Sequence, residues 1–508
     1  MKNKFIYLAI LAAGFASCEP EFENEVSANY SSGDADFTSY VAIGNSLTAG
    51  YMDGTVSRVG QTYSFPNLLA QKFALVGGGE FTQPSYEDDV NNLGGLMLGG
   101  MQIGNTRLVI DYSQVRPENL VGTPTIEVSN LQATAYNNMG VPGAKSFHLG
   151  VPGYGNLAGV ALGQSNPYFV RHATSPTATV LGDAMSKNPT FFTNWIGAND
   201  VLSYATNGGA QSDGVTPAAD HNITGNMNPA TYGSNDITNS NYFAGVYSNI
   251  INTLTSNGAK GVVATVPSVT SIPYFTTVPF NPVPLDAATA TRLNGIDGYA
   301  SYNGGLDLAF SNGLITNQER MKRKINFVAG KNPVVIVDND LTNLSGLGIP
   351  SYRMTTSQDL IVLPASSFIG TTVGGNPTLI NGVSVPLSNK WVLTANEKAK
   401  VASATASYNA SIRSIATSKG LAVADMNAIM NQLVTGLRIE DGTIYTANYF
   451  SSATASSVLF SLDGVHPNAK GYAVITNEII KVINRHYNAN LPFVYASSFP
   501  GATILLTN

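Results

Sequence analysis

The sequence predicts an α/β protein built on a parallel sheet, because helix and strand patterns alternate along the chain. Apolar residues recur at helical spacing over 243–254, Gly258 is placed to end that helix, and the apolar run 261–266 follows as a buried strand. The same order returns where a second helix ends near Gly420 and a strand follows at 421–425. Such helix–strand pairs build parallel sheets. We therefore expect a three-layer α/β/α domain with a parallel sheet of about five strands.

Local signals place the other regular elements. Residues 40–43 and 190–196 are apolar enough to be buried strands. Thr394 and Glu397 form a capping box at the start of the second helix, and a last helix is expected over 469–487.

Several stretches lack this alternation. The glycine-rich region 54–135 shows no sustained helical periodicity, 137–144 reads as a tight turn, and 207–241 is a long polar loop. Residues 267–389 are rich in Pro, Gly and Thr, and we interpret them as a large insertion that carries one further strand at 333–338.

Composition indicates an extracytoplasmic protein. Of the 508 residues, 44% are hydrophobic but only 11% are charged, against roughly 25% charged in an average soluble domain. Polar character comes instead from Asn, Ser, Thr, Tyr and 50 glycines. The formal net charge of −6 gives no basic face for nucleic acid.

The first residues have the pattern of a targeting segment. Lys2 and Lys4 precede the apolar run 5–13, which is too short to span a bilayer, and small residues lead to Cys18. Cys18 is the only cysteine, so no disulfide forms within the chain. This arrangement resembles the lipobox of bacterial lipoproteins, which implies cleavage of residues 1–17 and lipidation of Cys18. The alternative is a chance cysteine in an ordinary signal peptide.

Residues 18–36, which begin at this cysteine, are acidic and polar and are expected to be a lipidated, solvated tether before a folded domain over 37–508. Acidic residues directly after a lipidated cysteine also resemble an export signal that sends lipoproteins to the outer cell face. We therefore expect a protein anchored at Cys18 in the outer membrane or on the cell surface.

Ser46 is the first candidate for chemistry. Gly44 permits a tight turn after the strand at 40–43, which leaves Ser46 at the carboxyl edge of that strand and near a helix N-terminus. A sharp strand-to-helix turn presents a serine hydroxyl to a cleft as a nucleophile. The alternative is that Ser46 is an ordinary helix N-cap.

His466 is the second candidate, at the start of the last helix. Asp463, three residues earlier in Asp463-Gly464-Val465-His466-Pro467, can accept from the imidazole Nδ1–H and orient Nε2 as a base, and Pro467 suits the first helical turn. The alternative is a loop histidine beside an incidental acid. The other histidines lack such a setting and metal-ligand spacing, and are interpreted as structural: His148, His172, His221 and His486.

Together these motifs resemble the GDSL, or SGNH, hydrolase family. Gly44-Asn45-Ser46-Leu47 is similar to the nucleophile block, with Asn45 where the family usually has Asp. The other blocks are matched, in the family's order, by Asn137-Met139-Gly143, by Gly197-Ala198-Asn199-Asp200 and by Asp463-Gly464-Val465-His466. The resemblance implies an SGNH-hydrolase-like fold and leaves the segments 54–135, 205–241 and 267–389 unexplained.

The resemblance also implies the roles of these residues in an ester hydrolase. Ser46 would attack the ester carbonyl, His466 would accept its proton, and Asp463 would orient the imidazole. The oxyanion would be bound by the Ser46 and Gly143 backbone N–H groups and by the Asn199 amide. Gly140 is the alternative to Gly143. This chemistry needs no cofactor.

Other functions stay open. The same fold could serve a surface lipoprotein that binds glycans or lipids without catalysis. If the protein is an enzyme, the expected substrate is an acyl lipid or an acylated glycan, so lipase, phospholipase and carbohydrate esterase remain alternatives. The apolar residues 96–98 and Phe280 favour a lipid chain slightly. The acidic clusters 87–89 and 338–340 lack calcium-loop spacing and are interpreted as solvated turns.

Overall fold

The chain folds around a five-stranded sheet in the order β17-β8-β7-β1-β6, in which every neighbouring pair is parallel. The computed structural model describes residues 29–111, 113, 116–451, 453–454 and 457–505. The sheet strands are β1 (Tyr40–Gly44), β6 (Asn138–Gly140), β7 (Phe191–Trp195), β8 (Lys260–Ala264) and β17 (Ala422–Ala424). The predicted α/β class and the parallel sheet of five strands are confirmed.

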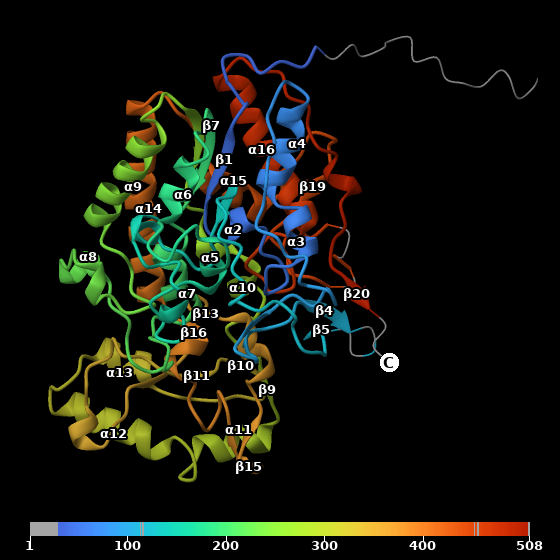
Figure 1. Ribbon diagram of the computed structural model, residues 1–508. Coiled ribbons are helices and arrows are strands. Elements are labelled where there is room, and N and C mark those ends of the chain that lie inside the picture. Colours follow the sequence, from blue (N-terminus) through green and yellow to red (C-terminus); the bar gives the residue numbers. More distant parts are fainter. Residues whose placement is uncertain (1–28, 112, 114–115, 452, 455–456, 506–508) are drawn as a thin grey trace, which may run out of the picture.

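Helices pack on both faces of this sheet (Figure 1). Alternate residues of β1 point to opposite sides, so that Val41 and Ile43 join one hydrophobic cluster while Tyr40 and Ala42 join the other. The first cluster is covered by α6 (Val180–Met185), α9 (Ser240–Leu254) and α14 (Ala395–Ser418), and the second by α4 (Phe65–Ala74) and α16 (Ala469–His486).

The fifth strand comes from a segment that the sequence predicted as a tight turn. Asn138 pairs with Ala42 and Met139 with Ile43, which makes β6 an edge strand beside β1. The turn is confined to the residues after β6. A strand of three residues containing Asn and Gly is too short and too polar to show a strand pattern.

Helices also occupy places where none was predicted. α3 (Arg58–Thr62) and α4 lie within 54–135, and α15 (Met426–Thr435) follows β17. The last helix, α16, begins at Ala469 as predicted and ends at His486, one residue earlier than predicted; Asn468 is its N-cap and accepts from the Gly471 N–H at 2.9 Å. Pro467 therefore precedes the cap instead of lying in the first turn. The loop 207–241 contains the short helix α8 (His221–Thr224).

The remaining elements outside the insertion are short. They are α2 (Ser46–Ala49), β2 (Leu96–Leu98), β3 (Met101–Gly104), β4 (Leu108–Asp111), β5 (Arg116–Asn119), α5 (Pro167–His172), α7 (Asn199–Thr206), β18 (Leu437–Arg438), β19 (Ile444–Tyr445) and β20 (Ile504–Leu505). No helix in the described ranges has both the length and the apolar character needed to cross a bilayer.

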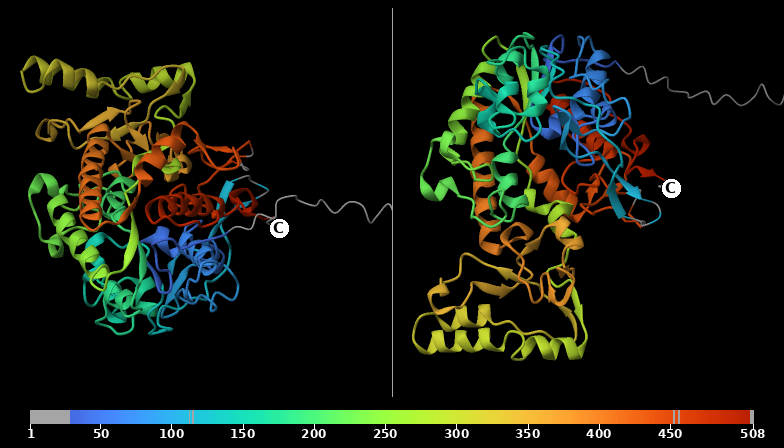
Figure 2. Two further views of the ribbon diagram at one scale, coloured as in Figure 1. Left: turned by 90° about the horizontal axis from the view of Figure 1, so that it is seen from above. Right: turned by 60° about the horizontal axis from the view of Figure 1, so that its bottom comes forward.

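The predicted insertion forms a separate lobe beside the sheet domain (Figures 1 and 2). Instead of one further strand, it holds several helices and short antiparallel strand pairs. Its elements are α10 (Pro273–Thr276), β9 (Val283–Leu285), α11 (Ala287–Asn294), α12 (Ala300–Ser311), α13 (Asn317–Arg323), β10 (Gly330–Asn332), β11 (Val335–Val337), β12 (Tyr352–Met354), β13 (Leu360–Ile361), β14 (Thr372–Val373) and β15 (Asn376–Ile380). β13 pairs with β16 (Val392–Leu393), which follows the insertion. Strands this short leave no readable alternation in the sequence.

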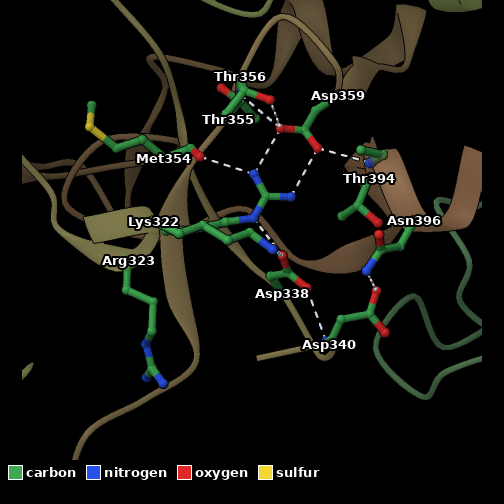
Figure 3. A network of polar contacts seen from close by, with 12 residues as sticks. Lys322, Arg323, Asp338, Asp340, Met354, Thr355, Thr356, Asp359, Thr394 and Asn396 are labelled. Atoms are coloured by element: carbon green, nitrogen blue, oxygen red, sulfur yellow. Dashed lines mark hydrogen bonds and ion pairs between the residues drawn. The ribbon is translucent and has the colours of Figure 1, made fainter. Parts of the chain in front are cut away.

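A buried ionic network joins this lobe to the start of α14 (Figure 3). The Arg353 guanidinium binds both oxygens of Asp359, at 2.7 and 2.9 Å, and also binds Asp338. Asp359 in turn accepts from the Ala395 N–H in the first turn of α14 at 3.1 Å. Burial opposes ionisation of both carboxyls, but their hydrogen bonds to Arg353 hold the pKa of each below its ordinary value.

The N-terminal predictions are only partly covered by the described residues. The signal segment 1–17 and Cys18 lie outside them. The end of the predicted tether packs on the folded domain instead of being solvated. The Asp34 N–H donates to the Tyr487 carbonyl at 2.7 Å, and Ala35 is buried. The folded part therefore begins several residues before position 37.

Candidate active site

The structure brings Ser46, His466 and Asp463 into one hydrogen-bonded chain. His466 Nε2 lies 2.9 Å from Ser46 Oγ, and His466 Nδ1 lies 2.8 Å from Asp463 Oδ2. Ser46 is 420 positions away from His466 along the sequence. The order hydroxyl, imidazole, carboxylate is the arrangement in which a serine is activated by a base that a third group orients.

Asn45 explains how the local sequence presents the serine. β1 ends at Gly44, and the Asn45 side chain caps α2 by accepting from the Leu47 N–H at 3.1 Å. Ser46 is thus the first residue of α2 and not its cap, so the alternative reading of Ser46 as an N-cap is wrong. Its hydroxyl is free for His466, and its N–H has no partner within the helix. An Asn oxygen serves this capping role as well as an Asp oxygen.

The Asp463 carboxylate is held from several directions. Oδ1 accepts from the Val465 and His466 N–H groups, both at 2.8 Å, and Oδ2 accepts from the Gly54 N–H at 3.1 Å. Burial raises the pKa of Asp463, but the His466 charge and these N–H donors outweigh it and hold the pKa below its ordinary value. The carboxylate therefore stays ionised and fixed beside the imidazole.

A tyrosine packs against the imidazole. The Tyr51 and His466 ring centroids are 4.5 Å apart, and the Tyr51 carbonyl accepts from the Tyr472 hydroxyl at 2.7 Å. This packing leaves the His466 side chain 13% exposed. The ring thus has contact with solvent while its orientation is fixed from the side and from Asp463.

Asn199 is the side-chain donor predicted for the oxyanion. It is the first residue of α7 and lines the same cavity as Ser46 and His466. Its Nδ2 donates to the Ala144 carbonyl at 2.9 Å, which uses one amide hydrogen and leaves the second. The bond also ties α7 to the turn that contains Gly143.

Gly143 and Gly140 differ in what their N–H groups do. Gly143 is exposed in a left-handed turn with φ of +78°, and within the described part of the chain its N–H donates to no other group. The Gly140 N–H instead donates to Asn138 Oδ1 at 3.0 Å, and a Cβ there would lie 2.2 Å from the Ala49 nitrogen. Gly140 is a packing residue, and Gly143 keeps the candidate role, although it does not line the cavity that Ser46 and Asn199 share.

Asp200 supports the turn that contains Gly143. It is the last residue of the Gly197-Ala198-Asn199-Asp200 motif, and the sequence alone indicated no role for it. Its carboxylate accepts from the Ser146 N–H at 2.8 Å and from the Ser146 hydroxyl at 2.9 Å. Burial raises the pKa of Asp200. Asn199, through the Ala144 carbonyl, and Asp200, through Ser146, together fix this part of the chain to the start of α7.

Asp53 is a second supporting residue that sequence reasoning missed. Its Oδ1 accepts from the Leu462 N–H at 3.0 Å, and its own N–H donates to the Ser461 hydroxyl at 3.1 Å. Burial, with the nearby Asp463 charge, raises the pKa of Asp53 to about 7. Asp53 has a left-handed φ of +56°. The only sequence signal for this position is the Asp53-Gly54 pair, and such pairs are common in ordinary turns.

An apolar cavity of about 120 Å³ opens beside Ser46. Ser46, Asn199 and His466 lie in its lining, together with Asn45. The rest of the lining is apolar side chains, glycine and proline from α2, the end of β7, α7, the segment after β8, α15, β18, the loop before α16, and α16 itself. Residues 96–98 and Phe280, which favoured a lipid chain in the sequence, are not among them.

The other titratable candidates lie outside this cavity. His221 bonds to Asp236 at 2.9 Å, and burial lowers the pKa of His148 to about 4 and of His172 to about 3. The acidic clusters are not solvated turns as predicted, because Asp89 and Asp338 are buried. Among the described residues, no group of three or more His, Cys, Asp or Glu side chains is arranged to hold a metal ion.

Comparison of the chain with protein-family models, with curated proteins and with solved structures finds no match in any of the three.

Proposed function

We propose that the protein is a serine hydrolase that cleaves carboxylic esters. The observation that carries this proposal is the hydrogen-bonded chain from Ser46 through His466 to Asp463, with Asn199 in the same cavity. Its motifs and their order support membership of the GDSL/SGNH family, and the parallel sheet with helices on both faces is compatible with that family's three-layer fold.

The mechanism follows from the positions of the atoms. His466 Nε2 accepts the Ser46 proton as Oγ attacks the ester carbonyl, and the imidazolium that forms is stabilised by Asp463. His466 then donates this proton to the leaving alcohol. Water, deprotonated by the same nitrogen, hydrolyses the acyl-serine and restores the free hydroxyl.

Donors beside the nucleophile would stabilise the oxyanion of each tetrahedral intermediate. We assign this role to the Ser46 N–H, the free hydrogen of the Asn199 amide and the Gly143 N–H. Each such donor typically contributes about 2.7–4 kcal/mol to lowering the barrier. Asn is suited to this position because its amide donates without carrying a charge.

A binding protein without catalysis is the alternative from a different class. Such a protein has no need for a serine hydroxyl, a base and a buried carboxylate in one line. Hydrolysis of 4-nitrophenyl butyrate by the purified chain, abolished in Ser46→Ala, is the expected result. Hydrolysis that persists unchanged in Ser46→Ala would remove the catalytic assignment, and absence of hydrolysis in the native chain would favour the binder.

We further propose that the enzyme is anchored at the cell surface or outer membrane through a lipid on Cys18. The support is the leader-like segment before the single cysteine. Metabolic labelling with an alkyne-bearing fatty acid is expected to label the chain and to fail in Cys18→Ala.

A further inference from the structure

The cavity beside Ser46 is a built pocket and not a surface hollow. Its walls come from parts of the chain that are far apart in sequence, including α15, α16 and the loop that carries His466. Met430 and Leu433 on α15 are each 6% exposed, and Val474 on α16 is 3% exposed. Because these side chains are buried around an opening that reaches the nucleophile, a group that enters the cavity is removed from water.

The chemistry of the lining selects an aliphatic group. Met426, Met430 and Leu433 form one wall, and Val269 and Ile272 form another. The polar groups that share the cavity are the candidate catalytic ones and the capping residue Asn45, while the Trp195 indole N–H is already bound to the Thr265 carbonyl at 3.2 Å. A sugar would leave its hydroxyl groups without partners in such surroundings, which is unfavourable. Methionines also adapt to flexible apolar chains.

We infer that this cavity holds the acyl chain of the ester substrate, so that the enzyme prefers esters of aliphatic carboxylic acids over acetyl esters of sugars. The inference rests on the proposed hydrolase function. It narrows the substrate classes that the sequence left open to those with an apolar acyl group.

The cavity suits the acyl group better than the alcohol because of what each does in the reaction. The alcohol leaves after the first step, whereas the acyl group stays bonded to Ser46 Oγ until water cleaves it. A buried cavity whose lining includes Ser46 and Asn199 matches the part that stays. The alcohol can depart on the solvent side, where His466 is partly exposed.

The size of the cavity limits the length of the acyl chain that it can bury. At about 120 Å³ it approaches an engineered protein cavity of ~150 Å³ that binds benzene, so it holds on the order of six carbon atoms. Burial of each methylene is then worth roughly a fourfold gain in kcat/KM until the cavity is full. We expect kcat/KM to rise from acetate to about hexanoate and then to level off.

The test measures kcat/KM for 4-nitrophenyl esters from acetate to dodecanoate, in the native chain and in Met430→Trp. The indole is expected to fill the cavity and to reduce the hexanoate-to-acetate ratio by at least about tenfold. Met321→Trp makes the same exchange on an exposed residue of α13, where Met321 is 59% exposed, and is expected to leave the ratio as it is.

A second series separates the two halves of the ester. Alkyl acetates from ethyl to hexyl acetate, followed by acid release in a pH-stat, are expected to show little dependence on alcohol length. A length preference confined to this series would assign the cavity to the alcohol and overturn the acyl assignment.

A third experiment measures binding of sodium octanoate to Ser46→Ala by calorimetry. Because no ester is cleaved, this experiment tests the cavity independently of catalysis. Binding that Met430→Trp weakens in the Ser46→Ala background supports the inference even if no ester is cleaved, in which case only the hydrolase proposal fails. Efficient cleavage of acetate with no effect of chain length, and no octanoate binding, would leave the hydrolase proposal standing and overturn the acyl pocket.

Discussion

The backbone N–H of Gly54 donates to Asp463 Oδ2, the same oxygen that bonds to the His466 imidazole. These residues are 409 positions apart. The loop that follows Ser46 thus holds the carboxylate that bonds to the His466 imidazole. Asp53 adds a second link to the same loop through the Leu462 N–H. The segment after Ser46 and the loop before α16 are therefore joined beside the candidate triad, and the relative position of Ser46 and His466 does not depend on either segment alone.

Replacement of Asp463 by Asn is expected to lower kcat by about 10⁴-fold while the chain stays folded. Asp463 Oδ2 accepts from the Gly54 N–H and bonds to His466 Nδ1, and an amide NH₂ in its place cannot accept either bond. An amide that donates to Nδ1 favours the imidazole tautomer with its proton on Nε2, which cannot accept the Ser46 proton. Steady-state kinetics with 4-nitrophenyl butyrate, together with circular dichroism, measure both effects. Asp297→Asn, at an exposed carboxyl in the lobe, serves as the control and is expected to leave kcat unchanged. Equal activity of Asp463→Asn and the native chain would contradict the assignment.

Asn199→Ala is expected to lower kcat by about 10²–10³-fold with a smaller change in KM, because an oxyanion donor acts mainly on the transition state. The measurement is kcat and KM on the same ester. A change in KM alone would indicate that Asn199 only shapes the cavity.

Gly140→Ala is expected to act on stability instead of on the oxyanion. Its Cβ would lie 2.2 Å from the Ala49 nitrogen, so the free energy of unfolding should fall by about 1–3 kcal/mol. Gly304→Ala in α12 is the matched control: a Cβ there meets nothing within 4 Å, and the helix should gain roughly 0.5–1 kcal/mol. Chemical denaturation measures both. A stable Gly140→Ala variant would contradict the packing assigned to this glycine.

Asp53 predicts a pH dependence of stability. Its pKa is raised to about 7 in the folded chain, so above the unfolded pKa of about 4 the folded state holds a proton that the unfolded state has lost. The free energy of unfolding should therefore decrease as the pH rises towards 7, by at most about 1.4 kcal/mol per pH unit from this group.

Asp53→Asn is expected to flatten that slope in urea titrations between about pH 4 and 7. Some slope remains, because burial also raises the pKa of Glu397 to about 7. Asp441→Asn is the control: hydrogen bonds hold the pKa of Asp441 below its ordinary value, so its removal should not change the slope in this range. An undiminished slope in Asp53→Asn would show that this carboxyl is ionised throughout.

The buried network of the lobe predicts a large effect of Arg353. Arg353→Met leaves Asp359 buried without its cation and Asp338 with only Lys322, whose Nζ lies 3.4 Å from Oδ2, and should cost about 3–5 kcal/mol of unfolding free energy. Arg413→Met breaks a pair with Asp425 whose side chains are 44% and 40% exposed, and should cost no more than about 1 kcal/mol. Thermal and denaturant unfolding measure the difference. Similar small losses in both variants would mean that water reaches Asp338 and Asp359.

Short-range patterns were enough to predict most of the sheet and to single out the candidate residues Ser46, His466 and Asp463. The strand at 40–43, the capping box of Thr394 and Glu397, and the Asp463–His466 spacing are all local signals, and the structure has each of them. Ser46 could be found because a strand-to-helix turn needs Gly44 and a polar cap within a few residues.

What sequence reasoning missed depends on contacts between distant segments. β6 is a strand only because Asn138 and Met139 lie beside β1. The carboxyl of Asp53 has its partner at Leu462, and the cavity forms where α15 and α16 meet the end of the sheet. The burial of Asp338 likewise depends on Arg353, which a local reading of an acidic turn does not reveal.

The most direct test of the account is mass spectrometry of the intact and digested chain after incubation with an alkyl fluorophosphonate, which reacts with activated serine hydroxyls. The account predicts a single covalent adduct on Ser46 that is lost in Ser46→Ala and strongly slowed in His466→Ala. A native chain that acquires no adduct, or one that is modified equally when Ser46 is replaced, would contradict it.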